Sequence, residues 1–309
     1  MHLVRSAALA AAMAMVSMSP RAALAWDDLG HMIVTRIAWS QLTPATRARV
    51  IALLEQAPAD AGLAQLRPAP GAAERDLMFA AYASTWPDLV RHEDPPARHA
   101  YNHPTWHYIN WYWTTTAGGK VEPVTSIPAD TVNIVSQLAR LTAIVRDSAA
   151  PAGERAVAVA WVLHLGGDIA QPLHASSRVD EADPQGDHGG NGYMLDAPMS
   201  LHWYWDRVFS TRYPRLSAEE DDKYLARVTG YVLKNAPPGF TAAQLAPADF
   251  DLWAHQSLDA AQHQVYCCGV ERNAAASPAY LAHAGEVSDA AVVLAGYRLA
   301  ALLEQLLGK

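Results

Sequence analysis

The chain has 309 residues, of which 51% are hydrophobic and only 17% are charged, and this composition excludes an intrinsically disordered protein. The formal charge of −8 at pH 7 excludes a protein that holds nucleic acid mainly through a basic surface. A protein of this composition that acts on phosphates needs a local source of positive charge, and bound metal ions are one such source.

The first 25 residues have the pattern of an export signal. Arg5 lies in a weakly basic start, and an apolar run follows from Ala7 to Met18. The segment Ala23-Leu24-Ala25 has the small-x-small pattern of a cleavage site. We therefore expect residues 1–25 to be a signal peptide that is removed after Ala25, with secretion or periplasmic localisation of the rest. The formal charge of the mature chain would then be about −10, because two arginines leave with the signal.

The mature chain is expected to begin at Trp26 and to fold as one domain over residues 26–309. Apolar residues recur at helical spacing through most of it, which predicts an all-α fold. Thr43 and Pro44 supply an N-cap and a first-turn proline, and Ser217 with Glu220 has the spacing of a capping box. The helix that follows Thr43-Pro44 carries Val50, Ile51, Leu53 and Leu54. The other predicted helical segments are 26–42 and those near 72–90, 128–147, 155–171, 244–266 and 285–308.

The aromatic segment from Trp106 to Trp113 fits either extended backbone or a loop that ends at Gly118-Gly119. The sequence contains no internal repeat, low-complexity tail or long linker, which favours a single compact multi-helix domain. The apolar run of the signal is too short to cross a bilayer, and no later segment is expected to be long enough.

The only two cysteines, Cys267 and Cys268, are adjacent. Neighbouring cysteines rarely bond to each other, so we expect no disulfide framework, and neither cysteine has a spacing typical of metal ligands. Several histidines have no ligand-like neighbours and are expected to be structural or exposed. They are His92, His99, His103, His255, His263 and His283.

Two histidine–aspartate pairs point to metal chemistry. His164 and Asp168 are four residues apart in a predicted helix and therefore share one face. Pro172 is expected to break that helix just before His174, which would turn this histidine toward a neighbouring site. The segment His202-Trp-Tyr-Trp-Asp206 repeats the four-residue spacing.

Further polar clusters lie in aromatic, weakly charged surroundings: Asp88 with Arg91, His107 with Asn110, and Trp26 with His31. One such pair alone is more often a surface ion pair. Several together favour a metal site, because charged groups are seldom placed in apolar helices without partners. Imidazole and carboxylate ligands without cysteine suit zinc, although manganese and iron accept similar ligands.

Taken together, these residues resemble the zinc-dependent single-strand-specific nucleases and 3′-nucleotidases, the type I nucleases that include mung bean and Penicillium nuclease. The related zinc phospholipases C have the same metal scaffold. The resemblance extends from Trp26 to the segment Ala295-Gly-Tyr-Arg-Leu-Ala300. It implies the all-α fold of these enzymes, three Zn²⁺ ions, and hydrolysis of single-stranded DNA and RNA to 5′-phosphorylated products, with 3′-nucleotidase activity.

The resemblance also implies a role for each ligand. The first zinc would be held by Asp88, His107, His164 and Asp168. The second would be held by the free amine and carbonyl oxygen of Trp26, by His31, and by Asp168 as a bridge. The third would be held by His174, His202 and Asp206. Asp88, Asp168 and Arg91 would form the catalytic set, with Arg91 stabilising charge on the phosphate.

The substrate-binding residues implied by the resemblance are Tyr108, Asn110, Gly190 and Asn191. Tyr108 occupies the position of an aromatic residue that stacks on the base. Asn110 stands where fungal members have an aspartate that contacts the base, and Asp27 stands where the family usually has glycine. Gly190 and Asn191 belong to a loop that would form a wall of the substrate pocket.

Two other functions remain as alternatives. A phospholipase C would use the same scaffold, but its last ligand pair usually ends in glutamate, and Asp206 here favours the nuclease. A non-catalytic zinc-binding protein would fill every coordination position with protein groups, whereas this ligand set leaves positions open. No stable protein partner is implied.

Overall fold

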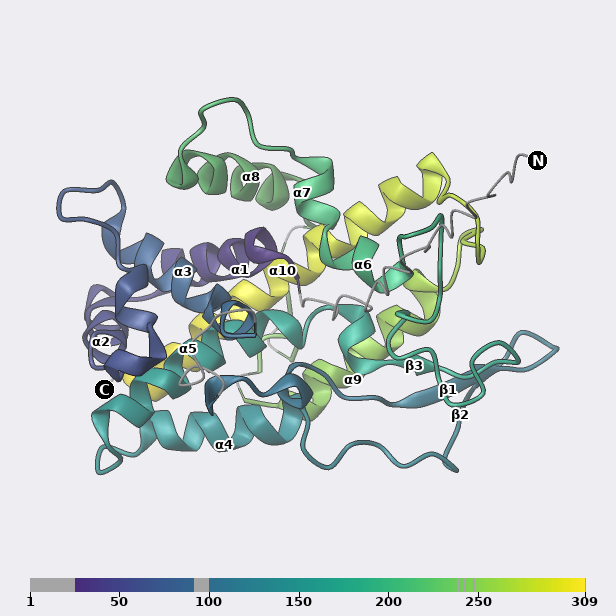
Figure 1. The fold of residues 1–309 in the computed structure, drawn as a ribbon, viewed down its shortest axis with the longest axis horizontal. Helices are drawn as coiled ribbons and strands as arrows, with labels where there is room; N and C mark the ends of the chain where they lie inside the picture. Colours follow the sequence, from purple (N-terminus) through teal and green to yellow (C-terminus); the bar gives the residue numbers. More distant parts are fainter. Residues whose placement is uncertain (1–25, 92–99, 238, 242, 247, 309) are drawn as a thin grey trace, which may run out of the picture.

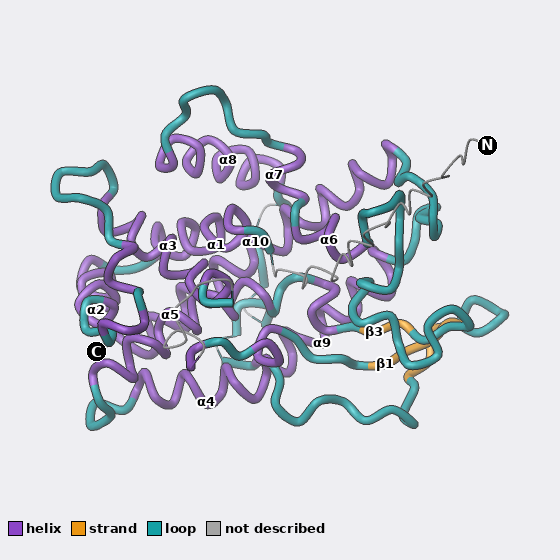
Figure 2. The backbone as a smooth tube through the Cα atoms, viewed as in Figure 1, coloured by secondary structure: helices purple, strands orange, loops and turns teal. Residues whose placement is uncertain are grey.

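The computed structural model describes residues 26–91, 100–237, 239–241, 243–246 and 248–308. The expected signal, residues 1–25, lies outside this part of the chain, as do His92 and His99. Most of the described residues are helical, with one small sheet at the edge of the molecule (Figures 1 and 2). The predicted multi-helix fold is therefore confirmed.

Ten α-helices form the body of the described protein. They are α1 (Asp28–Gln41), α2 (Pro44–Leu54), α3 (Arg75–Leu89), α4 (Ile134–Arg146), α5 (Ala152–Asp168), α6 (Leu201–Asp206), α7 (Val208–Arg212), α8 (Asp221–Asn235), α9 (Phe250–Ala260) and α10 (Pro278–Leu307). Short 3₁₀ helices are η1 (Ala59–Ala61), η2 (Leu63–Leu66), η4 (Pro104–His107) and η5 (Pro172–Ala175), and η6 (Ala261–Val265) is a π-helix.

Helix α5 lies at the centre of the fold and carries the first histidine–aspartate pair. Every residue from Ala158 to Asp168 is buried, and α5 packs against α3 and α4 as well as α1, α2 and α10. Such a helix has no polar outer face, so a charged side chain on it must find partners inside the protein. His164 and Asp168 are therefore placed in the interior by the same packing that forms the core.

Some helix starts follow the sequence signals and others do not. Thr43 caps α2 by accepting a hydrogen bond from Thr46 N–H at 3.2 Å, as predicted. The capping box predicted at Ser217 and Glu220 is wrong. In the described chain the N-cap of α8 is Glu220, three residues after Ser217, and it makes no side-chain cap hydrogen bond. The neighbouring Glu219 accepts from Leu216 N–H at 3.1 Å and pairs with Arg227 at 2.7 Å.

Helix α10 is longer than predicted. It begins at Pro278, where the Ser277 hydroxyl accepts from Tyr280 N–H at 3.1 Å. By length and composition it could cross a membrane, so the expectation that no later segment is long enough is wrong. In the fold this helix runs diagonally through the molecule along α1, and 56% of its most apolar window is buried (Figure 1). Its apolar length therefore serves the protein core.

The sheet connects two segments that lead to the site. β1 (Tyr112–Thr115) pairs antiparallel with β2 (Val121–Pro123) and parallel with β3 (Ser177–Arg178), in the order β2-β1-β3. The aromatic segment is therefore a short 3₁₀ turn followed by a strand. Since β1 follows His107 and β3 follows His174, their pairing brings these two histidines into one neighbourhood.

The two cysteines form a disulfide, which corrects the expectation from their adjacency. Cys268 has left-handed backbone with φ of 60°, in the turn that follows η6. This turn conformation brings the two sulfur atoms to the same side of the chain, so that adjacency does not prevent the bond.

Candidate metal centre

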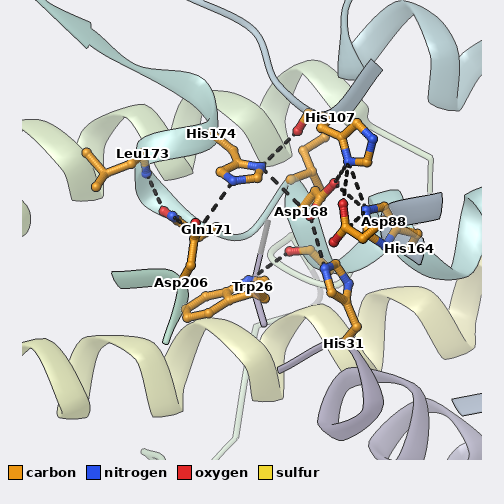
Figure 3. Close-up of polar contacts among 12 residues, drawn as sticks. Trp26, His31, Asp88, His107, His164, Asp168, Gln171, Leu173, His174 and Asp206 are labelled. Carbon is orange, nitrogen blue, oxygen red and sulfur yellow. Dashed lines mark hydrogen bonds and ion pairs between the residues drawn. The ribbon is translucent and has the colours of Figure 1, made fainter. Parts of the chain in front are cut away.

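The predicted ligands come from six separate elements and converge in the interior (Figure 3). His31 lies on α1, Asp88 on α3, His107 at the end of η4 and His174 on η5. His164 and Asp168 lie in the last turns of α5, while His202 and Asp206 lie on α6. All eight side chains are buried, with relative exposures between 0% and 6%.

Asp168 is the centre of this arrangement. One carboxylate oxygen, Oδ2, lies 3.0 Å from His107 Nδ1 and 3.0 Å from His164 Nε2. The other oxygen, Oδ1, faces His31 Nε2 at 3.3 Å. The two oxygens of one carboxylate thus face different imidazoles, as a bridging ligand requires, and the rings of His31 and His164 are stacked with centroids 4.0 Å apart.

Asp88 completes the group around His107 and His164. Its oxygens lie 3.8 Å from His107 Nδ1 and 3.9 Å from His164 Nε2. Arg91, three residues later, has its Nε 3.4 Å from Asp88 Oδ1 and also lines the adjoining pocket. Asp88 therefore connects the histidines to a guanidinium that faces the pocket.

A second cluster is formed by His174, His202 and Asp206. His202 Nε2 lies 3.2 Å from Asp206 Oδ2, and His174 Nε2 lies 3.8 Å from Asp206 Oδ1. The two imidazole rings are stacked, with centroids 5.1 Å apart. Their ligand atoms lie within 4.8 Å of one another, a spacing at which a single ion can bind all three.

Trp26 lies between the two clusters, at the start of the described chain. Its side chain is fully buried, and its indole N–H donates to the Gly167 carbonyl at 3.1 Å. The next residue, Asp27, donates its N–H to the Asp206 carbonyl at 2.8 Å. The side chain and the following peptide thus fix the backbone of Trp26 beside the ends of α5 and α6.

Two glycines allow this close packing. A Cβ at Gly30 would lie 2.7 Å from Trp26 Cβ, and a Cβ at Gly167 would lie 2.9 Å from His31 Nδ1. Both distances are too short for any larger residue. The contacts of Trp26 and His31 with α1 and α5 therefore depend on the absence of side chains at these positions.

Several buried donor and acceptor atoms have no hydrogen-bond partner within the described chain. Those that belong to the predicted ligands are both ring nitrogens of His31, Asp88 Oδ1, His107 Nε2, Asp168 Oδ1, His174 Nε2 and Asp206 Oδ2. Such groups are costly to bury unless something else satisfies them. Because these unpaired atoms are imidazole nitrogens and carboxylate oxygens, the donor set fits divalent zinc-like cations.

Burial also moves the protonation equilibria of these ligands. It raises the pKa of Asp88 to about 6 and the pKa of Asp168 well above its usual range. Burial lowers the pKa of His31, His107 and His174 well below 6.5. The imidazoles are therefore neutral and able to coordinate, while the carboxylates need a nearby cation to remain ionised.

Backbone carbonyls orient three of the imidazoles. The Nδ1 atoms of His164, His174 and His202 lie 2.7, 2.8 and 2.6 Å from the carbonyl oxygens of Ser84, His107 and Gly189. A proton held on Nδ1 by a carbonyl leaves the Nε2 lone pair for a metal. His202 differs in its pKa, which burial lowers and the Asp206 carboxylate raises, with a net rise.

Gln171 is a buried residue of the site that the sequence analysis missed. Its side-chain N–H donates to Asp206 Oδ1 at 2.7 Å, and its Oε1 accepts from Leu173 N–H at 2.5 Å. Its place directly before Pro172, in the segment that leads to His174, is the sequence signal that could have indicated it. Gln171 thus fixes a carboxylate that faces two imidazoles.

We expect Gln171→Met to weaken metal binding at the His174 cluster by about 10- to 100-fold, the usual cost of losing an outer hydrogen bond to a ligand. Competition with a chromophoric chelator measures this affinity, and excess metal should restore the bound ion. Gln137→Met on α4, a buried glutamine that bonds to Ser136 and Arg140, is the matched control. Equal metal affinity in the two variants would contradict the role of Gln171.

A pocket of about 240 Å³ opens onto the clusters. Arg91, Tyr108, Asn110 and Asn191 line it together with His107, His174 and His202. His188 and Gly189, which precede Asn191 in the loop that was predicted to form a wall of the pocket, also line it. Gly190 faces Leu173 and Tyr266 instead, since a Cβ there would lie 3.3 Å from each.

Asn110 has a partner that its sequence neighbours did not indicate. Its side-chain N–H donates to Asp130 Oδ2 at 3.1 Å. A carboxylate is therefore present beside the position where the fungal proteins have aspartate, and it comes from a different part of the chain.

The profile of the family described as S1/P1 Nuclease matches residues 26–308. The chain belongs to the S1/P1 nuclease family. A comparison with curated proteins finds no match. The nuclease is accordingly a phosphodiester hydrolase that acts on nucleic acid. Its family is zinc-dependent, and the buried histidine–aspartate clusters are suited to hold that metal.

Proposed function

We propose that the nuclease is a secreted enzyme that binds three zinc ions and cleaves single-stranded DNA and RNA to 5′-phosphorylated products, with 3′-nucleotidase activity as well. The observation that carries this proposal is the position of Asp168, whose Oδ1 faces His31 while its Oδ2 faces His107 and His164. One carboxylate between two imidazole groups supports a pair of neighbouring ions, and the separate His174 cluster supports a third.

The proposed ligand assignment is the one that the family resemblance implies, and the buried histidine–aspartate groups support it. Asp88, His107, His164 and Asp168 would hold the first ion, and His31, Asp168 and the amine and carbonyl of Trp26 the second. His174, His202 and Asp206 would hold the third. When bound, zinc would supply positive charge that attracts the phosphate. It would also lower the pKa of a bound water molecule to about 7. The ions also resolve the conflict between an acidic chain and an anionic substrate.

The remaining steps fall to side chains in the pocket. Arg91 would donate N–H groups to non-bridging phosphate oxygens, and the adjacent Asp88 carboxylate orients its guanidinium. Asp88 and Asp168 would hold the ions while the phosphate binds. The fixed positions of these groups lower the cost of orienting the phosphate for in-line attack.

An aromatic side chain in the pocket supports the single-strand preference. Tyr108 presents a half-buried ring in the wall of this pocket, whose volume is about 240 Å³. A base in a duplex is already paired and stacked, whereas an unpaired base can leave the strand and stack on an aromatic side chain. Asn110 with Asp130, and Asn191 from the facing loop, would contact the edge of that base.

Tyr108→Ala is expected to raise KM for denatured DNA about tenfold while kcat changes less, because stacking on an aromatic side chain contributes about 1–3 kcal/mol per base. Tyr108→Phe keeps the ring and should retain most of the affinity. Tyr231→Ala removes an exposed tyrosine of α8 and is the control. If Tyr108→Phe lost as much affinity as Tyr108→Ala, the ring would not be the binding element.

Metal removal tests the proposed function directly. The protein beginning at Trp26 should contain three zinc ions per chain, lose cleavage of denatured DNA in chelator, and recover it on adding zinc. Duplex DNA should be cleaved far more slowly, and a 3′-mononucleotide should release phosphate. Fewer than three ions, or equal rates on duplex and denatured DNA, would contradict the corresponding part of the proposal.

A phospholipase C on the same scaffold is the alternative that this assay separates. The family match favours the nuclease, as does the aspartate at the end of the third ligand set. Hydrolysis of phosphatidylcholine without cleavage of denatured DNA would support the phospholipase.

A further inference from the structure

A second group of potential metal ligands lies outside the histidine–aspartate centre. Cys267 and Cys268 follow η6, and His283 lies in the second turn of α10. The ligand atoms of the three residues lie within 4.8 Å of one another. Cys267 Sγ is 3.8 Å from His283 Nε2, although the two residues are 16 positions apart in the sequence. The tertiary structure therefore groups residues whose sequence spacing does not indicate a site.

Two of these ligand atoms face the same backbone group. Cys267 Sγ lies 3.3 Å from the Gln264 carbonyl oxygen, and His283 Nε2 lies 3.0 Å from that oxygen. The start of α10 and the end of η6 are thus fixed so that the imidazole and the sulfur point into one small volume. Such preorganisation lowers the entropic cost of binding one ion with several ligands.

The cluster is open to solvent. Cys268 is exposed, and Cys267 and His283 are half-buried. A small reductant and a metal ion can therefore reach the sulfur atoms without unfolding of the surrounding helices. The eight buried ligands of the main centre contain no sulfur, so the two sets of ligands differ in chemical softness as well as in position.

We propose that reduction of the Cys267–Cys268 disulfide creates a site for one soft, thiophilic cation, held by the two thiolates and His283. A dithiol reductant would supply two electrons and two protons, becoming a cyclic disulfide as the protein disulfide becomes two thiols. A divalent cation then displaces the two thiol protons. On binding, His283 Nε2 gives up its hydrogen bond to the Gln264 carbonyl, and its ring proton moves to Nδ1 through solvent. The Nε2 lone pair then binds the ion, and a solvent molecule completes the coordination.

Cadmium titration of the reduced, zinc-loaded protein tests this proposal. Cadmium–thiolate bonds give an ultraviolet charge-transfer band that imidazole and carboxylate ligands do not give. Because the chain has only two cysteines, the band reports on this cluster alone. We expect one equivalent of cadmium to produce the full band in the reduced protein and none in the oxidised protein. The readout does not depend on nuclease activity, so failure of this proposal is distinguishable from failure of the proposed function.

Variants test each ligand. Cys267→Ser and Cys268→Ser should each reduce the band by at least half. His283→Ala should keep the thiolates and weaken cadmium affinity at least about tenfold, since losing a direct ligand should cost no less than losing an outer contact. His263→Ala is the matched control, because His263 is an exposed imidazole of η6 whose Nδ1 lies 2.9 Å from the Asp259 carbonyl. No band in the reduced protein, or equal cadmium affinity in the His283 and His263 variants, would overturn the proposal.

Discussion

Replacing Asp168 with asparagine is expected to reduce cleavage of denatured DNA by at least about a thousandfold, because the change removes the one carboxylate that both halves of the two-ion site share. The amide of Asp168→Asn would keep the size of the side chain but lose its charge. Metal analysis should show two fewer tightly bound ions, while the ion at His174, His202 and Asp206 remains. Asp222→Asn on α8, another buried aspartate, should leave both activity and metal content unchanged.

The same variant gives a pH-dependent signature in the metal-free protein. Burial raises the pKa of Asp168 well above its usual value of 3.8, so the folded state holds this proton to higher pH than the unfolded state does. The free energy of unfolding that depends on Asp168 therefore falls as pH rises above 3.8. Asparagine does not titrate in this range, so Asp168→Asn does not lose unfolding free energy in this way as pH rises.

In chelator, the melting temperature of Asp168→Asn relative to the unsubstituted protein should thus rise with pH from about 4 toward neutrality. Because such a variant is folded at neutral pH, this result would assign its lost activity to the loss of metal and not to unfolding. A variant that keeps normal cleavage, or one that is less stable than the unsubstituted protein at neutral pH without metal, would contradict the assignment of Asp168.

Blocking the α-amine of Trp26 should reduce activity at least about a hundredfold and remove one zinc ion per chain, because an amide nitrogen has no lone pair to donate to a metal. A protein beginning Met-Trp26 and one that retains residues 1–25 provide two forms of the blocked amine. The indole contact with Gly167 and the Asp27 contact with Asp206 fix the backbone at this point. The blocked nitrogen of Trp26 therefore could not readily move to a position that restores metal binding.

A tag of the same length at the C-terminal end is the control for this experiment, since it leaves the amine of Trp26 free. Circular dichroism should show the same helical content in all forms. Full activity and three bound ions in the blocked protein would remove Trp26 from the ligand set and leave the second ion with His31 and Asp168.

The sequence predicted the local parts of the site. His164 with Asp168 and His202 with Asp206 lie on single helices, and a spacing of four residues in a helix determines that two side chains share a face. The break at Pro172 also follows from local backbone preferences, although α5 ends at Asp168 and not at residue 171 as predicted. The resemblance to a known family added which distant residues belong together, and in the structure these residues lie in buried histidine–aspartate groups.

Other features depended on packing between distant segments. The sequence did not indicate that Asn110 meets Asp130, that Gln171 fixes Asp206, or that α10 is a core helix. It also gave the wrong result for the two cysteines, because a left-handed residue in a turn permits a bond that the average geometry of adjacent residues disfavours.

The sequence by itself determined that this protein is helical, that only 17% of its residues are charged, and that paired imidazoles and carboxylates lie one helical turn apart. Each of these properties depends on composition or on neighbours within a few residues. Only the tertiary structure decided that the two oxygens of Asp168 face different imidazoles and that His283 lies beside Cys267. The physical reason is that such contacts form where helices pack, and their geometry depends on the shape of the whole core, which no local spacing specifies.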